Sequence, residues 1–577
     1  MSRLSTLNIA FALALTCPLG HALRAQSTAD SLPICEGRPV QQVRVTTLRP
    51  AFRGRLQQLW QRVARAIGMH HETTSPGLVR RFVTVDPGSK CTAFRLAETE
   101  RLLRAQPFLA DAIVIPSRSA RGDSVTVDVS TVDEIPVILG GRFHRTQLEA
   151  LNIGTLNFGG EGMRVEGKWE HRDGFREGFG GTFAHHQVFG KPYTLRLDGM
   201  RHPLGENYEA SLGHAFLTDL QKLAWNVGYE TNKDFAHLRR PDRTELLQPV
   251  DGARWNAGSA IRIGPPRRLA LVGAMMAGTR IVPRDQFSEA DTLTGLLSAP
   301  VDTAGVRHYP TYDQTNLAGV LGLRALTYNA LPGLDALEGT QDVATGTQIG
   351  TIFGVPAFRG DRLSDAFVSV DEYIGRRRGN SFFGVRASAE SRLDMQMADW
   401  RHLVGSGRAA WYYKPNDKYV TETSLEAAGV WRSLLPFQIE LGDRQSGVPG
   451  YARSLEAGSQ RLLARVEERG EMTRFNERAA FGLAAFVAGG RLWAGDAPFG
   501  VNTPIRVSVG MALLAAVPSQ SRRTIRAELA IPLARSTGAR PELRFTIREP
   551  TVGFWQEPWR VHWARLVSVP EQIFTWP

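Results

Sequence analysis

The residues Val125-Thr126-Val127-Asp128-Val129-Ser130-Thr131-Val132-Asp133 mark the point at which the pattern of this 577-residue sequence changes. Valines alternate here with polar residues, which predicts a β-strand with one buried face. Residues 40–133, which end with this strand, carry mixed helix and strand patterns. Residues 136–548 instead repeat a two-residue alternation broken by Gly, Pro and Asn turns. The sequence therefore predicts an α+β module followed by an all-β domain.

The first module combines strand and helix signals. Residues 40–45 alternate as a strand, and apolar residues at spacings of three and four predict a helix over 56–67. An extended segment at 79–85 and a second helix at 94–103 follow. A short strand at 112–115 then precedes the valine strand, so the expected order is strand, helix, strand, helix, strand, strand.

The pattern of residues 136–548 predicts the wall of a β-barrel. In residues 383–390, Phe383, Val385 and Ala387 alternate with Arg386, Ser388 and Glu390. Apolar groups on one face and charges on the other suit a sheet between lipid and a wet lumen. Closure would satisfy every backbone amide, as lipid requires, although a soluble β-sandwich alternates similarly. The region offers roughly 15 to 19 strand candidates.

Residues 1–25 have the pattern of a secretory signal, with a short apolar core at 9–15 and small residues near Ala22 and Ala25. Its removal would also remove Cys17 and leave Cys35 and Cys91. A pair of cysteines in an exported chain predicts a disulfide, the alternative being two buried thiols.

Several function classes find no support in the sequence. The net charge of +12 is dispersed, and only seven of the 69 basic residues are lysines, so we expect no nucleic-acid partner. The sequence contains no G-x-S-x-G, G-x-x-x-x-G-K-[ST], H-E-x-x-H or C-x-x-C motif, so we expect no enzyme, no catalytic or metal site and no cofactor.

The junction resembles a POTRA module, the periplasmic unit of BamA/TamA-type outer-membrane proteins of the bacterial surface-antigen superfamily. The resemblance lies in residues 96–104, 108–112 and 125–133. It implies a periplasmic module over residues 26–135 and a barrel of 16 antiparallel strands over residues 136–548, in the outer membrane of a Gram-negative-type bacterium. An exposed sheet edge could take a client strand, with Val125, Val127 and Val129 as candidates; a spacer or lid is the alternative.

A second resemblance concerns a loop that, in the family, folds into the lumen and carries an arginine. The resemblance lies in Gly447-Val448-Pro449-Gly450-Tyr451 and in the predicted strand that carries Glu467 and Arg469. Pro449 stands where the family arginine belongs and supplies no cation. Arg444 or Arg453 could replace it, with Glu467 as the expected partner. Ala488 likewise stands where the family has an aspartate.

The tail, residues 549–577, leaves two interpretations open. Trp555, Trp559 and Trp563 recur every four residues, as in an interfacial helix. Alternatively, residues 559–576 supply the closing strand, because Phe574 and Trp576 alternate at its end.

Three functions follow from these patterns. The first is a barrel that assembles, inserts or translocates proteins, with outer-membrane lipid and unfolded outer-membrane or secreted proteins as partners. The second is a passive porin or structural barrel, and the third is an outer-membrane enzyme. The module favours the first, whereas Pro449 and Ala488 favour the second.

Overall fold

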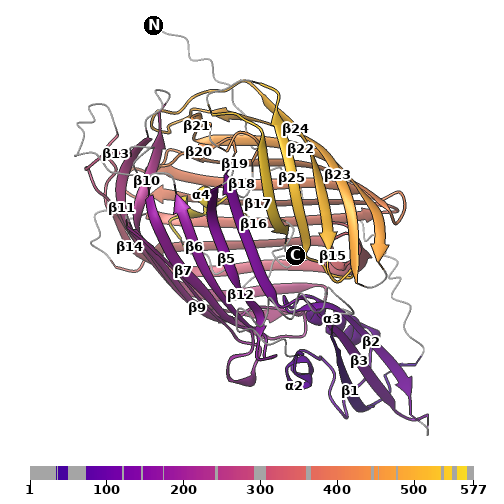
Figure 1. Ribbon diagram of the computed structural model, residues 1–577. Coiled ribbons are helices and arrows are strands. Elements are labelled where there is room, and N and C mark those ends of the chain that lie inside the picture. Colours follow the sequence, from indigo (N-terminus) through magenta and orange to yellow (C-terminus); the bar gives the residue numbers. More distant parts are fainter. Residues whose placement is uncertain are drawn as a thin grey trace.

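The computed structural model consists of a small α+β module at one end of a large β-barrel (Figure 1). It describes residues 34–35, 37–49, 73–119, 122–144, 147–172, 175–203, 205–240, 245–290, 307–358, 365–442, 447–452, 454–475, 478–534, 538–548, 555 and 557–567. The expected signal segment 1–25 and the expected helix over 56–67 lie outside these residues.

The module is built on a three-stranded sheet with the order β1-β3-β2. The strands are β1 (Val40–Leu48), β2 (Leu109–Arg118) and β3 (Val125–Asp133). β3 runs parallel to β1 and antiparallel to β2. The alternation read in the sequence is the burial pattern of β3, because its valines at 125, 127 and 129 form the centre of the module core.

Two helices accompany this sheet, α2 (Pro76–Arg80) and α3 (Ala93–Arg104), and α3 lies against β2. The segment 79–85, expected to be extended, instead begins inside α2. Ser75 caps this helix by accepting a hydrogen bond from the Leu78 N–H, and Pro76 provides the fixed φ that suits a first helical residue. The prediction of a strand here was therefore wrong, because the local capping signal outweighs the alternation of apolar residues.

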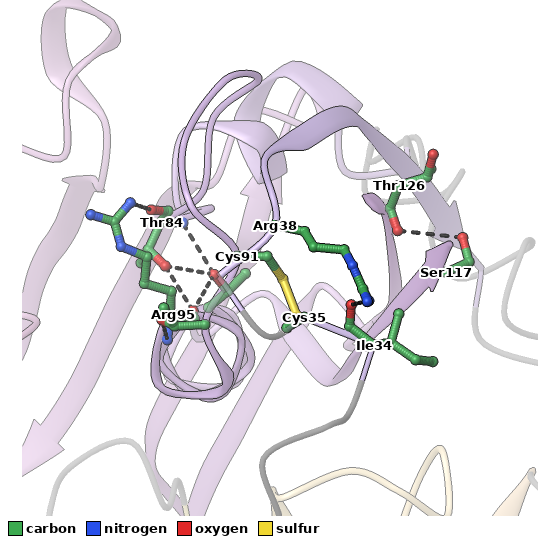
Figure 2. The surroundings of a disulfide bond; sticks show 10 residues. Ile34, Cys35, Arg38, Thr84, Cys91, Arg95, Ser117 and Thr126 are labelled. Carbon is green, nitrogen blue, oxygen red and sulfur yellow. Dashed lines mark hydrogen bonds between the residues drawn. A yellow bond between two sulfur atoms is a disulfide. The ribbon is translucent and has the colours of Figure 1, made fainter. Parts of the chain in front are cut away.

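A disulfide joins Cys35 to Cys91 within the module, with an S–S distance of 2.01 Å (Figure 2). It ties the segment before β1 to the segment before α3. Hydrogen bonds between backbone groups reinforce this link, since Gly37 N–H donates to the Cys91 carbonyl and Cys91 N–H donates to the Arg38 carbonyl. Both cysteines are buried in the core cluster.

Twenty strands close the barrel in the described part of the chain, each antiparallel to its neighbours along the sequence. Their bounds are β4 Val137–His144, β5 Gln147–Phe158, β6 Met163–Arg172, β7 Phe175–His185, β8 Thr194–His202, β9 Gly205–His214, β10 Leu223–Arg239, β11 Glu245–Ile263, β12 Leu269–Pro283, β14 Tyr312–Pro332, β15 Thr340–Pro356, β16 Asp365–Arg378, β17 Ser381–Asp394, β18 Asp399–Tyr413, β19 Tyr419–Trp431, β22 Gln460–Phe475, β23 Ala479–Trp493, β24 Arg506–Ala516, β25 Thr524–Pro532 and β26 Glu542–Arg548. A short strand, β13 (Ser288–Ala290), adds to β11, and β26 closes the sheet on β4.

The expected number of sixteen strands is therefore wrong. It came from the resemblance, and the roughly 15 to 19 candidates found from alternation also fall short of the twenty strands. Glycine-rich strands such as β7, whose sequence is FREGFGGTFAH, have few side chains to alternate. Alternation alone is a weak signal for each strand of a barrel, so the count could not be fixed from the sequence.

The two faces of the barrel wall differ in chemistry. Along β14 burial alternates residue by residue, and Leu317, Leu321 and Leu323 are exposed on the outside. Exposed apolar side chains on the other strands continue this outer surface, among them Phe353, Phe383, Trp411, Tyr413, Leu425, Val487, Leu513, Leu529 and Phe545. An apolar exterior on a closed sheet resembles that of an outer-membrane barrel. No helix in the described ranges is long and apolar enough to cross a membrane.

The module covers one mouth of the barrel (Figure 1). Its contacts reach the hairpins that join β5 to β6, β7 to β8, β9 to β10, β14 to β15 and β24 to β25. All these hairpins lie at the same end because the strands are antiparallel. The connection from β19 to β22 belongs to the opposite end.

We predict that the disulfide stabilises the module by roughly 4 kcal/mol, the chain-entropy value for a closed loop of this length. Replacing Cys35 and Cys91 together by Ala in the full chain should lower the module's free energy of unfolding by that amount, measured from hydrogen exchange of the β3 amides. In the unreduced, denatured wild-type chain, both thiols should resist labelling. Full labelling of both would contradict the bridge.

Candidate functional site

The candidate site is the barrel lumen, which the chain itself enters from two directions. The inner loop, defined here as residues 432–442, 447–452 and 454–459, connects β19 to β22. The C-terminal segment, defined as residues 555 and 557–567, follows β26. Buried residues of both pack with wall residues of the barrel in one apolar cluster, which includes Phe437, Val448, Tyr451, Phe486, Ala488, Val561 and Ala564.

The motif expected to fold into the lumen lies in the inner loop. Val448 and Tyr451 are fully buried, and the Tyr451 hydroxyl lies 3.1 Å from the Val507 carbonyl oxygen of β24. The Gly450 N–H donates to the Glu542 carboxylate at 2.6 Å. Gly450 has φ +87° and leaves no room for a side chain, since a Cβ there would lie 2.9 Å from Pro532. Glycine at this position therefore seats the loop against β25 and β26.

Charged side chains of the wall form a continuous ladder beside this loop. Its members alternate in sign and come from β18, β19, β22 and β25: Arg408, Glu422, Arg469, Glu467, Arg526, Glu528 and Arg465. The Arg526 guanidinium donates to Glu467 at 2.8 Å and to Glu528 at 2.8 Å. Because these groups are buried, each charge depends on its neighbours in the ladder for compensation.

Two arginines of the ladder lie against the ring of Phe486 on β23. The Arg465 guanidinium lies 3.8 Å from the centroid of the Phe486 ring, and that of Arg526 lies 5.8 Å away. Within the described residues, Glu467 pairs with Arg465 and Arg469 of β22 and with Arg526 of β25. Glu467 and Arg469 share the inward face, as their spacing indicates. Arg444 and Arg453, the expected replacements, lie outside the described residues.

The C-terminal segment lies inside the barrel, where α4 (Trp559–Ala564) is visible through the wall in Figure 1. Pro558 immediately precedes the helix, and the rings of Trp559 and Trp563 pack edge to face with centroids 5.1 Å apart. Neither expected placement holds for the described residues. The helix does not lie on the membrane surface, because Val561 and Ala564 are buried among lumen residues, and β26 rather than residues 559–567 closes the sheet.

Ion pairs fix the segment at both ends of α4. Arg560 pairs with Glu440 of the inner loop at 2.8 Å, and Arg565 pairs with Glu557 at 2.7 Å within the segment. The Arg565 guanidinium also donates to the Ser388 hydroxyl of β17 at 2.6 Å. The tryptophan spacing predicted the helix, but no local signal in these residues distinguishes a lumen from a membrane surface.

Side chains of the module fasten it to the barrel mouth. Arg104 of α3 makes a bidentate pair with Asp342 of β15, with N–O distances of 2.7 and 2.8 Å. The Arg101 guanidinium lies 4.2 Å from the centroid of the Tyr328 ring. Although burial opposes it, the pairing with Arg101 holds the pKa of the Glu98 carboxyl below its usual value. These contacts join the two parts through charged groups that are removed from water.

Two further groups at this mouth are buried with shifted pKa values. Glu134, just before the barrel begins, accepts a hydrogen bond from Ser521 at 2.7 Å, and burial raises the pKa of its carboxyl. His186, in the turn after β7, packs against Phe108 of the module, with ring centroids 6.2 Å apart. Burial, together with nearby cationic groups, lowers the pKa of His186 to about 4. His186 is therefore neutral at neutral pH.

The residues expected to receive a client strand do not lie at an edge. Val125, Val127 and Val129 belong to the central strand β3, whose backbone is paired with β1 and with β2. The sequence showed a buried strand but not its place in the sheet. The assignment of these valines as a client edge was therefore wrong.

The two real edges of the module sheet are β1 and β2. On β2, the Val114 N–H donates to the Glu100 carboxylate at 2.8 Å, and the Ala112 carbonyl accepts from Arg104 at 3.2 Å. Pro116 has no N–H to offer, so side chains and proline block this edge. On β1, the N–H and carbonyl of Val40 are bonded to Ser89 and Gly88. Within the described ranges no strand pairs with the outer side of residues 42–48 of β1.

Comparisons with known proteins gave matches in structure only. No protein-family model matches the sequence, and no curated protein matches it. CdiB from Escherichia coli is similar with a TM-score of 0.45 and 11% identity, covering 89% of this chain and 75% of that chain. BamA from Haemophilus ducreyi lacking POTRA domains 1-3 is similar with a TM-score of 0.40 and 12% identity, covering 88% and 84%. CdiB from Acinetobacter baumannii gives 0.39 and 10%, covering 89% and 74%.

We predict that the ladder, and not the loop proline, stabilises the lumen wall. Arg526→Ala removes a bidentate partner of buried Glu467 and should lower the free energy of unfolding by roughly 3 to 5 kcal/mol. Pro449→Ala should cost less than about 1 kcal/mol, the effect of proline on the unfolded chain. Urea midpoints in detergent micelles measure both.

Arg376→Ala, at an exposed position of β16, is the matched control and should leave the midpoint unchanged. Equal shifts for Arg526→Ala and Arg376→Ala would show that the ladder does not stabilise the barrel.

Proposed function

We propose that this chain is an outer-membrane barrel that translocates or inserts polypeptide clients, and that the structure represents its closed state. The observation that supports the proposal most strongly is that the lumen accommodates non-barrel polypeptide. The inner loop and the C-terminal segment both lie within the wall, held by ion pairs and hydrogen bonds. A lumen that binds and releases polypeptide is what such a function requires.

The polar character of these contacts supports a reversible closure. When the segments leave, water that enters the lumen can replace their ion-pair and hydrogen-bond partners, so each polar contact is lost at a smaller cost than if its groups stayed buried and unsatisfied. A passive porin, the alternative raised by Pro449 and Ala488, needs a continuous aqueous path. The C-terminal segment and the module occupy the lumen and one mouth, so the described conformation favours a gated barrel over a permanently open one.

For the module, we propose a periplasmic location and a POTRA-like role in receiving clients. The candidate edge becomes residues 42–48 of β1, because β2 is blocked and β3 is central. A client in extended form could add there through backbone hydrogen bonds, in parallel or antiparallel orientation.

The test is site-specific photo-crosslinking in cells with the full chain, which should also fractionate with the outer membrane as a heat-modifiable species. A photoreactive amino acid at Arg44 or Thr46 of β1 should trap extended outer-membrane or secreted proteins. The matched control is Asp128, the partner of Arg44 in the register of β3. A strand added to β1 would lie roughly 5 Å from β1 and twice as far from β3.

Adducts from Arg44 and Thr46 that exceed those from Asp128, identified by mass spectrometry, would support the proposal. Equal trapping at all three positions, or recovery of the chain as a soluble periplasmic protein, would contradict it.

A further inference from the structure

The lumen wall recognises the backbone of the C-terminal segment. Three carbonyl oxygens of the segment accept hydrogen bonds from wall side chains. Arg254 of β11 donates to the Trp563 carbonyl at 2.7 Å, and the Thr279 hydroxyl of β12 donates to the Leu566 carbonyl. His402 Nε2 of β18 lies 2.6 Å from the Ala564 carbonyl. Trp563 and Ala564 end α4, and Leu566 follows the helix, so the wall binds the last helical turn and the residues just after it. Because backbone groups are common to all sequences, this wall can hold a similarly folded peptide of another origin.

A buried carboxylate receives the amide groups of the same segment. Oε1 of Glu390 accepts the N–H groups of Leu566 at 3.1 Å and Val567 at 3.2 Å. Glu390 and Arg392 pair with each other, and the side chains of both are 0% exposed. Arg392 also donates to the Tyr312 hydroxyl at 2.6 Å. The wall thus fixes Glu390 in place with its oxygen directed at two successive amides.

The hydrogen bonds of His402 determine its tautomer. Its Nδ1 accepts the N–H of Leu434 in the inner loop at 3.0 Å, so this nitrogen carries no proton. The neutral ring must then carry its proton on Nε2, which donates to Ala564. One imidazole therefore connects the inner loop with the C-terminal segment.

Two apolar pockets receive consecutive side chains of the segment. Leu566 packs in a cluster with Ile281, Tyr312, Leu434 and Leu435. Val567 packs in a different cluster, which contains Leu271, Met275, Val320 and Phe367. Arg565, just before them, has an extended backbone with φ −66° and ψ 131°. Separate pockets for neighbouring side chains allow a wall to select the residues of a bound peptide.

We propose that Arg254, Thr279, Glu390 and His402 form a binding site for a peptide that ends a helical turn and continues with two consecutive aliphatic residues, and that the C-terminal segment occupies this site in cis. This inference rests on the proposed function, because the ligand that would displace the segment is the proposed client. A client segment of this chemistry would replace residues 563–567 and so couple its own binding to removal of the segment from the lumen.

The burial of the site explains why it needs an occupant. If the segment leaves, Glu390 keeps Arg392 but loses two amide donors inside the wall, and a buried carboxylate that lacks part of its hydrogen bonding is costly. Water or another backbone must replace them. The tethered segment has an effective concentration in the millimolar range, so a free peptide competes poorly until the segment is weakened.

The experiment uses the full chain in micelles and the fluorescein-labelled peptide His-Trp-Ala-Arg-Leu-Val, which corresponds to residues 562–567. The variant Leu566→Asn/Val567→Asn removes the apolar anchors of the tethered segment. Anisotropy should show saturable binding of the peptide to this variant, and at least tenfold weaker binding to the wild-type chain. The control peptide His-Trp-Ala-Arg-Asn-Asn, which has the same charge but lacks the two aliphatic side chains, should bind at least tenfold more weakly.

Two further measurements separate release of the segment from binding of the peptide. The thiol introduced by the reporter substitution Ala564→Cys should react slowly with maleimide in the otherwise native chain. It should react rapidly in a chain that also carries Leu566→Asn/Val567→Asn. Adding Thr279→Val to the double variant should weaken peptide binding about fivefold, the loss of one hydrogen bond. The control Thr345→Val, whose hydroxyl bonds to Thr327 and Asn329 of β14, should not weaken peptide binding.

Full reactivity of the reporter in the otherwise native chain would overturn the proposal, as would a double variant that binds neither peptide. These results are independent of the crosslinking test. Binding of the peptide without any client trapped at β1 would leave the peptide site standing and remove the translocation function.

Discussion

The width of a twenty-strand barrel is the constraint on which the rest of the structure depends. Small barrels fill their interior with side chains from the wall, but larger ones leave a lumen that must hold water or additional polypeptide. Here the inward face carries buried charges such as Glu390, Glu467 and Arg526. Each of these needs a partner within reach, because an unpaired buried charge would be strongly destabilising. The inserted segments and the charge ladder together meet that need.

The charge ladder and the inserted segments differ in whether they stay in place when the lumen empties. The ladder links β18, β19, β22 and β25 through side chains of the wall itself, so it can persist when the lumen empties. Two of its arginines, Arg465 and Arg526, also place their guanidinium groups against the ring of Phe486. Glu390 and His402 instead depend on the C-terminal segment for part of their hydrogen bonding. A stable wall and an exchangeable occupant are the combination that gating requires.

The sequence predicted local features better than relations between distant segments. Alternation identified β3 and the inward face shared by Glu467 and Arg469, because side chains in a strand point to opposite faces. It could not show that β3 is the central strand, since pairing partners are set by the whole sheet. The tryptophan repeat predicted α4 but not its burial, because an apolar helix face suits a lumen cluster as well as a membrane surface. The opposite holds at Ser75 and Pro76. There the local cap determines a helix, although the alternation over residues 79–85 predicted a strand.

Conductance across a planar lipid bilayer tests the closed, gated state most directly. The wild-type chain should give a small and infrequent current, because the C-terminal segment and the module obstruct the path. The Leu566→Asn/Val567→Asn variant should give a large, sustained current, while a variant at an exposed position, such as Arg376→Ala, should match the wild type. A wild-type chain that conducts as strongly as the double variant would contradict the account.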